Sequence, residues 1–139
     1  YGTEIILNEY SRFKNMSNIK VYPSIRFEYF LSLLRNARFM IGNSSAGIRE
    51  TGLYGVPAID IGTRQKNRYS LAELTNVQWV SENKTDICKA IDNVDKYRKP
   101  SIRFGDGTST EKFMNILASD IWDKNLQKQF YDLEIKDNV

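Results

Sequence analysis

The chain alternates between short apolar runs and stretches in which apolar residues recur at helical spacing. The short apolar runs predict strands at residues 19–22, 39–41, 58–61 and 77–80. Apolar residues three or four positions apart predict helices at residues 3–13, 27–37, 46–54, 84–97, 108–118 and 121–133. Strands that alternate with helices, spaced about 20 residues apart, favour right-handed crossovers. The pattern therefore predicts an α/β fold with a mainly parallel sheet.

Turn and capping residues refine several of these helices. Gly55 follows the 46–54 helix, at a position where a left-handed residue is favoured. Asn83 or Thr85 can cap the helix that contains Ile87 and Ala90, and Thr108–Glu111 fits a capping box. Cys88 falls on the predicted apolar side of its helix, so we expect a buried structural thiol.

The densest candidate chemistry lies between residues 39 and 68. A strand, a turn of small polar residues and a helix place backbone N–H groups and a positive helix end beside an anion. Ser44 and Ser45 add hydroxyl donors to this turn. An ordinary strand-to-helix turn with an N-cap serine explains these two serines equally well.

Two charged residues follow that turn at spacings that suit a nucleotide ligand. Glu50, one helical turn further on, can accept hydrogen bonds from ribose hydroxyls, and Arg64 can fork onto phosphate oxygens. The carboxyl ends of parallel strands meet at one edge of a sheet. We therefore expect the loops 42–47 and 62–68 to lie together, while Lys66 is expected at the surface and Arg68 either at phosphate or in solvent.

Composition excludes several classes of function. The net charge of +3 and the isoelectric point near 9.0 suit an anionic small-molecule ligand. Nucleic-acid binding is not expected, because the chain has no basic run with interleaved aromatic residues. The absence of histidine excludes a histidine-based catalytic triad and a histidine-ligated metal site within these 139 residues. We expect neither a metal nor an organic cofactor.

The single cysteine and the apolar content bear on location and completeness. One cysteine allows no internal disulfide, which favours a reducing, cytoplasmic setting. No apolar run approaches the ~20 residues of a membrane span, and no signal peptide is visible. The chain begins at Tyr1 without a methionine, so we expect it to be a piece of a longer protein.

The residues 42–68, GNSSAGIRETGLYGVPAIDIGTRQKNR, carry a family resemblance. They resemble the signature of the hydrolysing UDP-N-acetylglucosamine 2-epimerases of sialic-acid-type pathways, which reads G-N-S-S-x-G-x-x-E and then G-x-P-x-I-x-I-G-x-R-Q-x-x-R. A Phe-Gly-Asp-Gly element at 104–107 matches as well, although a tight turn that caps the following helix explains it without chemistry. A motif of this length is far more specific than a lone glycine loop.

The resemblance implies a fold and a set of ligand contacts. Residues 1–139 would form a single, incomplete Rossmann-like domain, the C-terminal UDP-binding half of a two-domain, GT-B-type enzyme. Ser44 and Ser45 would bind the diphosphate, Glu50 the ribose, and Arg64 the phosphate or leaving-group side. The loop near Ile25 and Phe27, with Phe30 behind it, would form the wall around the uracil ring, although a core position suits Phe30 equally well. The residues expected around UDP are Ile25, Phe30, Asn43, Ser44, Ser45, Gly47, Glu50 and Arg64.

The resemblance also implies a reaction. UDP-N-acetylglucosamine and water would give N-acetylmannosamine and UDP, through elimination of UDP and hydration of the glycal. No catalytic acid or base is assigned to this chain, because the family draws those groups from the other domain or from preceding segments. The partners implied are a UDP-N-acetylhexosamine, the missing N-terminal domain and, in a homo-oligomer, a second copy of the chain. Alone, the chain is expected to bind UDP weakly and to lack turnover.

The sequence leaves two other functions possible. A UDP-sugar glycosyltransferase of GT-B type and a non-catalytic nucleotide-sugar-binding module would share much of this pattern. The sugar itself is also open, because UDP-N-acetylglucosamine and a diacetamido-trideoxy relative would meet this domain through the same UDP contacts.

Overall fold

The structure is a computed structural model that describes residues 2–123 and residue 127. The chain divides into two compact units between Phe104 and Gly105, and each is described by itself. The first unit contains the sheet and the candidate site. None of the helices in the described part of the chain is long and apolar enough to cross a membrane.

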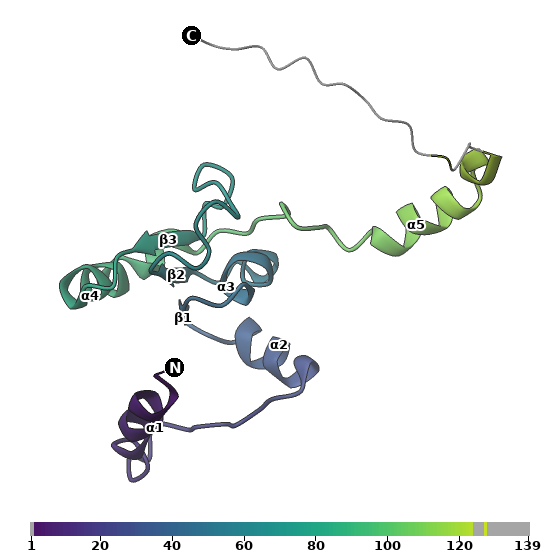
Figure 1. Ribbon diagram of the computed structural model, residues 1–139. Coiled ribbons are helices and arrows are strands. Elements are labelled where there is room, and N and C mark those ends of the chain that lie inside the picture. The colour runs from purple at the N-terminus through teal and green to yellow at the C-terminus, as the bar shows by residue number, and fades with distance from the viewer. Residues whose placement is uncertain (1, 124–126, 128–139) are drawn as a thin grey trace. The chain divides into compact units, whose positions relative to one another are not determined.

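A three-stranded parallel sheet forms the centre of the first unit (Figure 1). Its strands are β1 (Met40–Gly42), β2 (Ala58–Ile61) and β3 (Val77–Val80), in that spatial order. Met40 lies opposite Ala58, which in turn lies opposite Val77. The prediction of a parallel α/β sheet is confirmed, and the arrangement is that of a Rossmann-like fragment.

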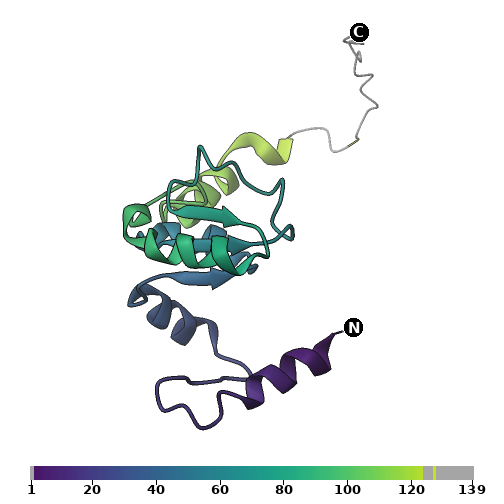
Figure 2. The same cartoon turned by 90° about the vertical axis from the view of Figure 1, so that its left-hand side faces the viewer.

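Side chains that alternate along β2 and β3 build a separate core on each face of the sheet. On one face, Ala58 and Val77 pack with Ile48 of α3 (Ala46–Arg49) and with Leu74. On the other face, Ile59 and Val80 pack with Ala90 of α4 (Lys84–Asp92). Figure 2 shows α4, drawn in green, running alongside the strands. The continuous apolar character of β2 follows from this burial on both faces.

The helices α1 (Thr3–Ser11) and α2 (Phe27–Arg35) confirm two predicted helices with slightly shorter bounds. The predicted strand at 19–22 is wrong. A strand requires a hydrogen-bonded neighbour, and within residues 2–123 no strand pairs with this segment.

The predicted helix at 46–54 is interrupted at Thr51. Its hydroxyl donates to the carbonyl of Gly47 at 2.8 Å, and its amide reaches back to Ala46 at 3.2 Å. The regular bond from the Thr51 amide to Gly47 is therefore replaced, and a 3-10 helix, η1 (Gly52–Tyr54), follows instead. Gly55 ends this segment in the left-handed conformation with φ 63°, as predicted.

For α4, one of the two predicted N-cap residues is confirmed, whereas the prediction that Cys88 is buried is wrong. Asn83, rather than Thr85, caps the helix, because its Oδ1 accepts from the amides of Thr85 and Asp86 at 2.8 and 3.3 Å. The helix ends at Asp92, and the 3-10 helix η2 (Val94–Tyr97) replaces the rest of the predicted segment. Cys88 is exposed rather than buried, because it lies about 100° around the helix from Ile87, which faces the sheet.

The second unit contains α5 (Ser109–Leu117) and the 3-10 helix η3 (Asp120–Asp123). The predicted capping box does not form. Instead, Oδ1 of Asp106 accepts hydrogen bonds from the hydroxyl and the amide of Thr108, which lower the pKa of Asp106 to about 2. Gly105 and Gly107, with φ of 133° and 89°, lie in irregular backbone before the helix, with a bend at Gly107, so the interpretation of this element as a capping turn stays a prediction. Most of the helix predicted at 121–133 lies outside the described residues.

Candidate functional site

The loops that leave the carboxyl ends of β1 and β2 meet, as predicted. Nε2 of Gln65 donates to the backbone carbonyl of Asn43 at 2.7 Å. Nη1 of Arg64 approaches Oδ1 of the same asparagine at 3.4 Å, which is a long and weak hydrogen bond. The turn after β1 and the basic loop after β2 therefore form one continuous surface at the strand ends.

Two further hydrogen bonds hold the basic loop in place. Nε1 of Trp79 donates to the carbonyl of Gly62 at 2.6 Å, and the hydroxyl of Tyr69 donates to Oδ2 of Asp60 at 2.7 Å. Gly62 has φ 80°, and a Cβ there would meet Oε1 of Glu82 at 2.6 Å. A glycine is thus required where the chain leaves β2. The loop is positioned at its start and at its end.

The sequence pattern did not single out Asp60. The side chain lies on the α3 face of β2 and is 4% exposed. Burial raises the pKa of Asp60, while the hydrogen bond from Tyr69 acts in the opposite direction. Burial and that same bond raise the pKa of Tyr69. Since Asp60 sits inside an apolar run that reads as a plain strand, nothing local distinguishes it.

A cavity of about 270 Å³ opens between α3 and the basic loop. Its lining residues are Ser45, Ile48, Arg49, Gln65, Arg68 and Phe104. The guanidinium of Arg49 lies over the ring of Phe104, 5.8 Å from the ring centroid. Arg49 and Phe104 were not among the predicted site residues, although Arg49 follows Ser45 by four positions and so shares its helix face.

The two serines of the turn differ in their hydrogen bonds. Oγ of Ser44 accepts from the amide of Ala46 at 3.3 Å and so supports the turn locally. Ser45 occupies the N-cap position of α3, yet its side chain makes no capping bond. Its hydroxyl is therefore available to the cavity that it lines. The N-cap interpretation accounts for neither the Ser45 hydroxyl nor the arginines around it.

Gly47 and Glu50 lie on other sides of α3. A Cβ on Gly47 would lie 3.7 Å from Cβ of Ala58 and 3.9 Å from Sδ of Met40, so this glycine faces the sheet. Glu50 is half-buried, and its Oε2 is buried without a hydrogen-bond partner among the described residues. A carboxylate oxygen in that state is costly unless a donor reaches it.

The two predicted uracil contacts lie away from the arginine cavity. Ile25 lines a separate, larger hollow of about 640 Å³ with Tyr22, Tyr29 and Leu33. The two hollows share no lining residue. Phe30 is half-buried and its ring stacks on Phe27 with a centroid distance of 6.4 Å. The structure thus places Arg64 against Asn43, two residues before Ser45, and leaves Ile25 outside the cavity that Ser45 lines.

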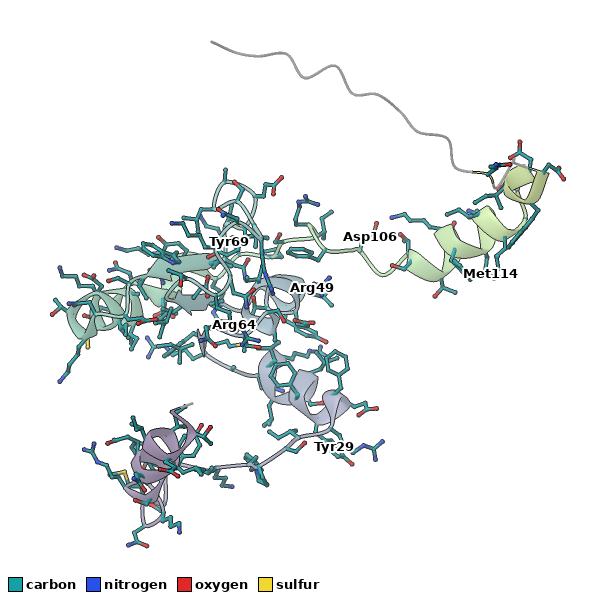
Figure 3. All side chains as sticks on the ribbon, viewed as in Figure 1. Tyr29, Arg49, Arg64, Tyr69, Asp106 and Met114 are labelled. Carbon is teal, nitrogen blue, oxygen red and sulfur yellow. The ribbon has the colours of Figure 1, made fainter. Side chains whose placement is uncertain are left out.

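Arg49, Arg64 and Arg68 form no ion pair with the described carboxylates. In the part of the chain that the structure describes, every ion pair uses a basic residue other than Arg49, Arg64 and Arg68. Figure 3 shows Arg49 and Arg64 beside α3 and the strand ends. A guanidinium without a carboxylate is a candidate for binding an anionic ligand.

The sequence profile of the UDP-N-acetylglucosamine 2-epimerase family matches residues 2–118. The chain belongs to this family. A UDP-N-acetylglucosamine 2-epimerase of Neisseria meningitidis serogroup B is 42% identical over 137 residues, which cover 96% of this chain and 36% of that protein. The chain therefore spans about a third of the length of this relative.

Two further relatives match shorter stretches. A GDP/UDP-N,N'-diacetylbacillosamine 2-epimerase (hydrolyzing) of Campylobacter jejuni is 43% identical over 63 residues, 45% of this chain and 16% of that protein. The polysialic acid biosynthesis protein P7 of Escherichia coli is 34% identical over 76 residues, 55% of this chain and 19% of that protein.

Proposed function

We propose that this chain is part of the UDP-binding half of a hydrolysing UDP-N-acetylglucosamine 2-epimerase. Such an enzyme converts UDP-N-acetylglucosamine and water to N-acetylmannosamine and UDP. The name of the Neisseria relative, which matches 96% of this chain, supports the epimerase activity. The word "hydrolyzing" in the name of the Campylobacter relative and the polysialic acid relative support the hydrolysing, sialic-acid-type reaction.

The observation that carries this proposal is the position of Arg64 against Asn43 at the joined ends of β1 and β2. The 3.4 Å contact between them is weak enough to be exchanged for a phosphate oxygen. The hydroxyls of Ser44 and Ser45 lie in the same turn. Together these groups would bind the diphosphate of UDP, in the crevice where ligands bind to parallel sheets.

Glu50 would bind the ribose. Its Oε2 lies buried without a donor, so a small rotation towards a ribose would give the carboxylate the hydrogen bonds that it lacks. Ile25 and Phe30 remain proposed contacts of the uracil ring.

In the proposed reaction, a base removes the proton at C2 of the sugar while the bond between C1 and the UDP oxygen breaks. Water then adds across the double bond of the glycal, with its hydroxyl at C1 and a proton at C2. Negative charge collects on the departing UDP, so Ser44, Ser45 and Arg64 would bind the transition state more tightly than the substrate. We propose that the proton-transfer groups come from a second domain, in a GT-B arrangement.

The test is product analysis by proton NMR with the full-length protein and UDP-N-acetylglucosamine. Free N-acetylmannosamine and UDP in equal amounts are expected. Formation of UDP-N-acetylmannosamine would show a non-hydrolysing epimerase. UDP binding without turnover would support a nucleotide-sugar-binding module, and a diacetamido-trideoxy substrate in place of UDP-N-acetylglucosamine would reassign the sugar.

A further inference from the structure

We propose that the cavity between Arg49 and Arg68 is a subsite for the terminal phosphate of a nucleoside diphosphate, and that it makes the site prefer UDP to UMP. This inference rests on the proposed UDP site. It assigns the two phosphates of UDP to different arginines, with Arg64 on the side of the nucleoside and the Arg49–Arg68 pair on the side of the sugar.

Ser45 connects the cavity to the proposed diphosphate turn. It lines the cavity, while Asn43, two residues earlier, contacts Arg64. One phosphate near Asn43 and Ser44 would therefore leave the next phosphate within reach of Ser45 and the cavity. Two linked phosphates require adjacent subsites, and this turn offers them in consecutive residues.

Neither guanidinium of the cavity forms an ion pair with a carboxylate among the described residues. The guanidinium of Arg49 lies 5.8 Å from the centroid of the Phe104 ring, and this cation–π contact does not neutralise its charge. Nη1 of Arg68 donates to Oε1 of Gln65 at 3.4 Å, a long and weak hydrogen bond to an uncharged acceptor. Among the described residues, the lining of the cavity contains no carboxylate.

Gln65 lies between Arg64 and Arg68 in the sequence of the basic loop. It is fully buried, with an exposure of 0%, and it contacts Asn43 through its nitrogen and Arg68 through its oxygen. Arg64, its neighbour in sequence, contacts the side chain of Asn43. Arg64 thus contacts the turn after β1, while Arg68 lines the cavity. Two guanidiniums fit a terminal phosphate, whose three oxygens can accept several N–H donors.

The experiment measures the dissociation constants of UDP and UMP for the full-length protein by calorimetry. Arg68→Gln and Arg49→Gln are each expected to weaken UDP about tenfold, the scale of one charged hydrogen bond, and to change UMP less than about twofold. Lys66→Gln, which removes one charge from the same exposed loop, is the control and should change neither constant. Arg64→Gln should weaken both nucleotides.

Phosphorus NMR provides a second readout. In bound UDP, the Arg68→Gln substitution is expected to shift the resonance of the β-phosphorus and to leave that of the α-phosphorus in place. Equal loss of UDP and UMP affinity in Arg68→Gln and Arg49→Gln, or no loss of either, would overturn the subsite while leaving the UDP site standing. Failure of the unsubstituted protein to bind UDP would overturn both proposals.

Discussion

Nε2 of Gln65 donates to the backbone carbonyl of Asn43 at 2.7 Å and ties the loop after β2 to the turn after β1. Replacing Gln65 by leucine roughly keeps the volume but removes the donor of this part-buried hydrogen bond. We expect Gln65→Leu to lower the free energy of unfolding by about 1–3 kcal/mol. Urea denaturation measures this change. The exposed Lys66→Leu is the matched control, and equal stability of the two variants would contradict the assignment.

Ser45→Ala separates function from stability. The Ser45 side chain makes no capping bond, so the free energy of unfolding should stay within about 0.5 kcal/mol. Turnover by the full-length protein should fall, by up to about 100-fold, if the hydroxyl supports the departing diphosphate. Ser44→Ala is the comparison, since Oγ of Ser44 accepts from Ala46 and its loss should cost about 0.5–1 kcal/mol. A Ser45→Ala protein that loses its thermal transition would favour a structural turn.

Glu50→Ala tests the ribose contact. We expect UDP affinity to weaken by about 1–3 kcal/mol, and UMP affinity by the same amount, because both nucleotides carry the ribose. Stability should not fall, because Oε2 has no hydrogen-bond partner to lose among the described residues. Calorimetry and urea denaturation on the same sample give both answers. Unchanged nucleotide affinity would remove Glu50 from the site.

Asp60 makes stability depend on pH in a defined direction. Burial raises its pKa above the ordinary value of 3.8, so the folded state retains the proton longer than the unfolded state does. The protonated, neutral form of Asp60 contributes to the free energy of unfolding, and this contribution is fully present below pH 3.8. It is lost as the pH rises through the raised pKa of Asp60 in the folded state. Relative to wild type, Asp60→Asn should therefore gain stability across that window. Urea denaturation from pH 3 to pH 7 tests this, and a constant difference between the two proteins would refute it.

Local periodicity was sufficient to predict β1, β2, β3 and most helices, because burial of one or both faces of an element determines which of its residues are apolar. It failed at residues 19–22, where an apolar run resembles a strand but pairing depends on distant residues. It also failed at Thr51, because one hydroxyl that bonds back to Gly47 changes the helix while the apolar spacing stays helical.

The candidate site was predictable as far as a single motif reaches. Asn43, Ser45 and Arg64 lie within one signature, and the rule that parallel strand ends meet brought them together. Phe104 lies far along the chain and reaches Arg49 because the amide of Ser101 donates to the carbonyl of Gly52 at 2.8 Å. A contact of this kind depends on tertiary packing, which the local pattern does not encode.

The brevity of α3 has a consequence for how an anion is captured. A helix of four residues has only a small dipole, so the attraction must come from side-chain charge on Arg49, Arg64 and Arg68. The field of such exposed charges is screened over about 8 Å at physiological ionic strength. Association of a nucleotide should therefore slow markedly as salt is added, whereas a site built on buried backbone amides would respond little.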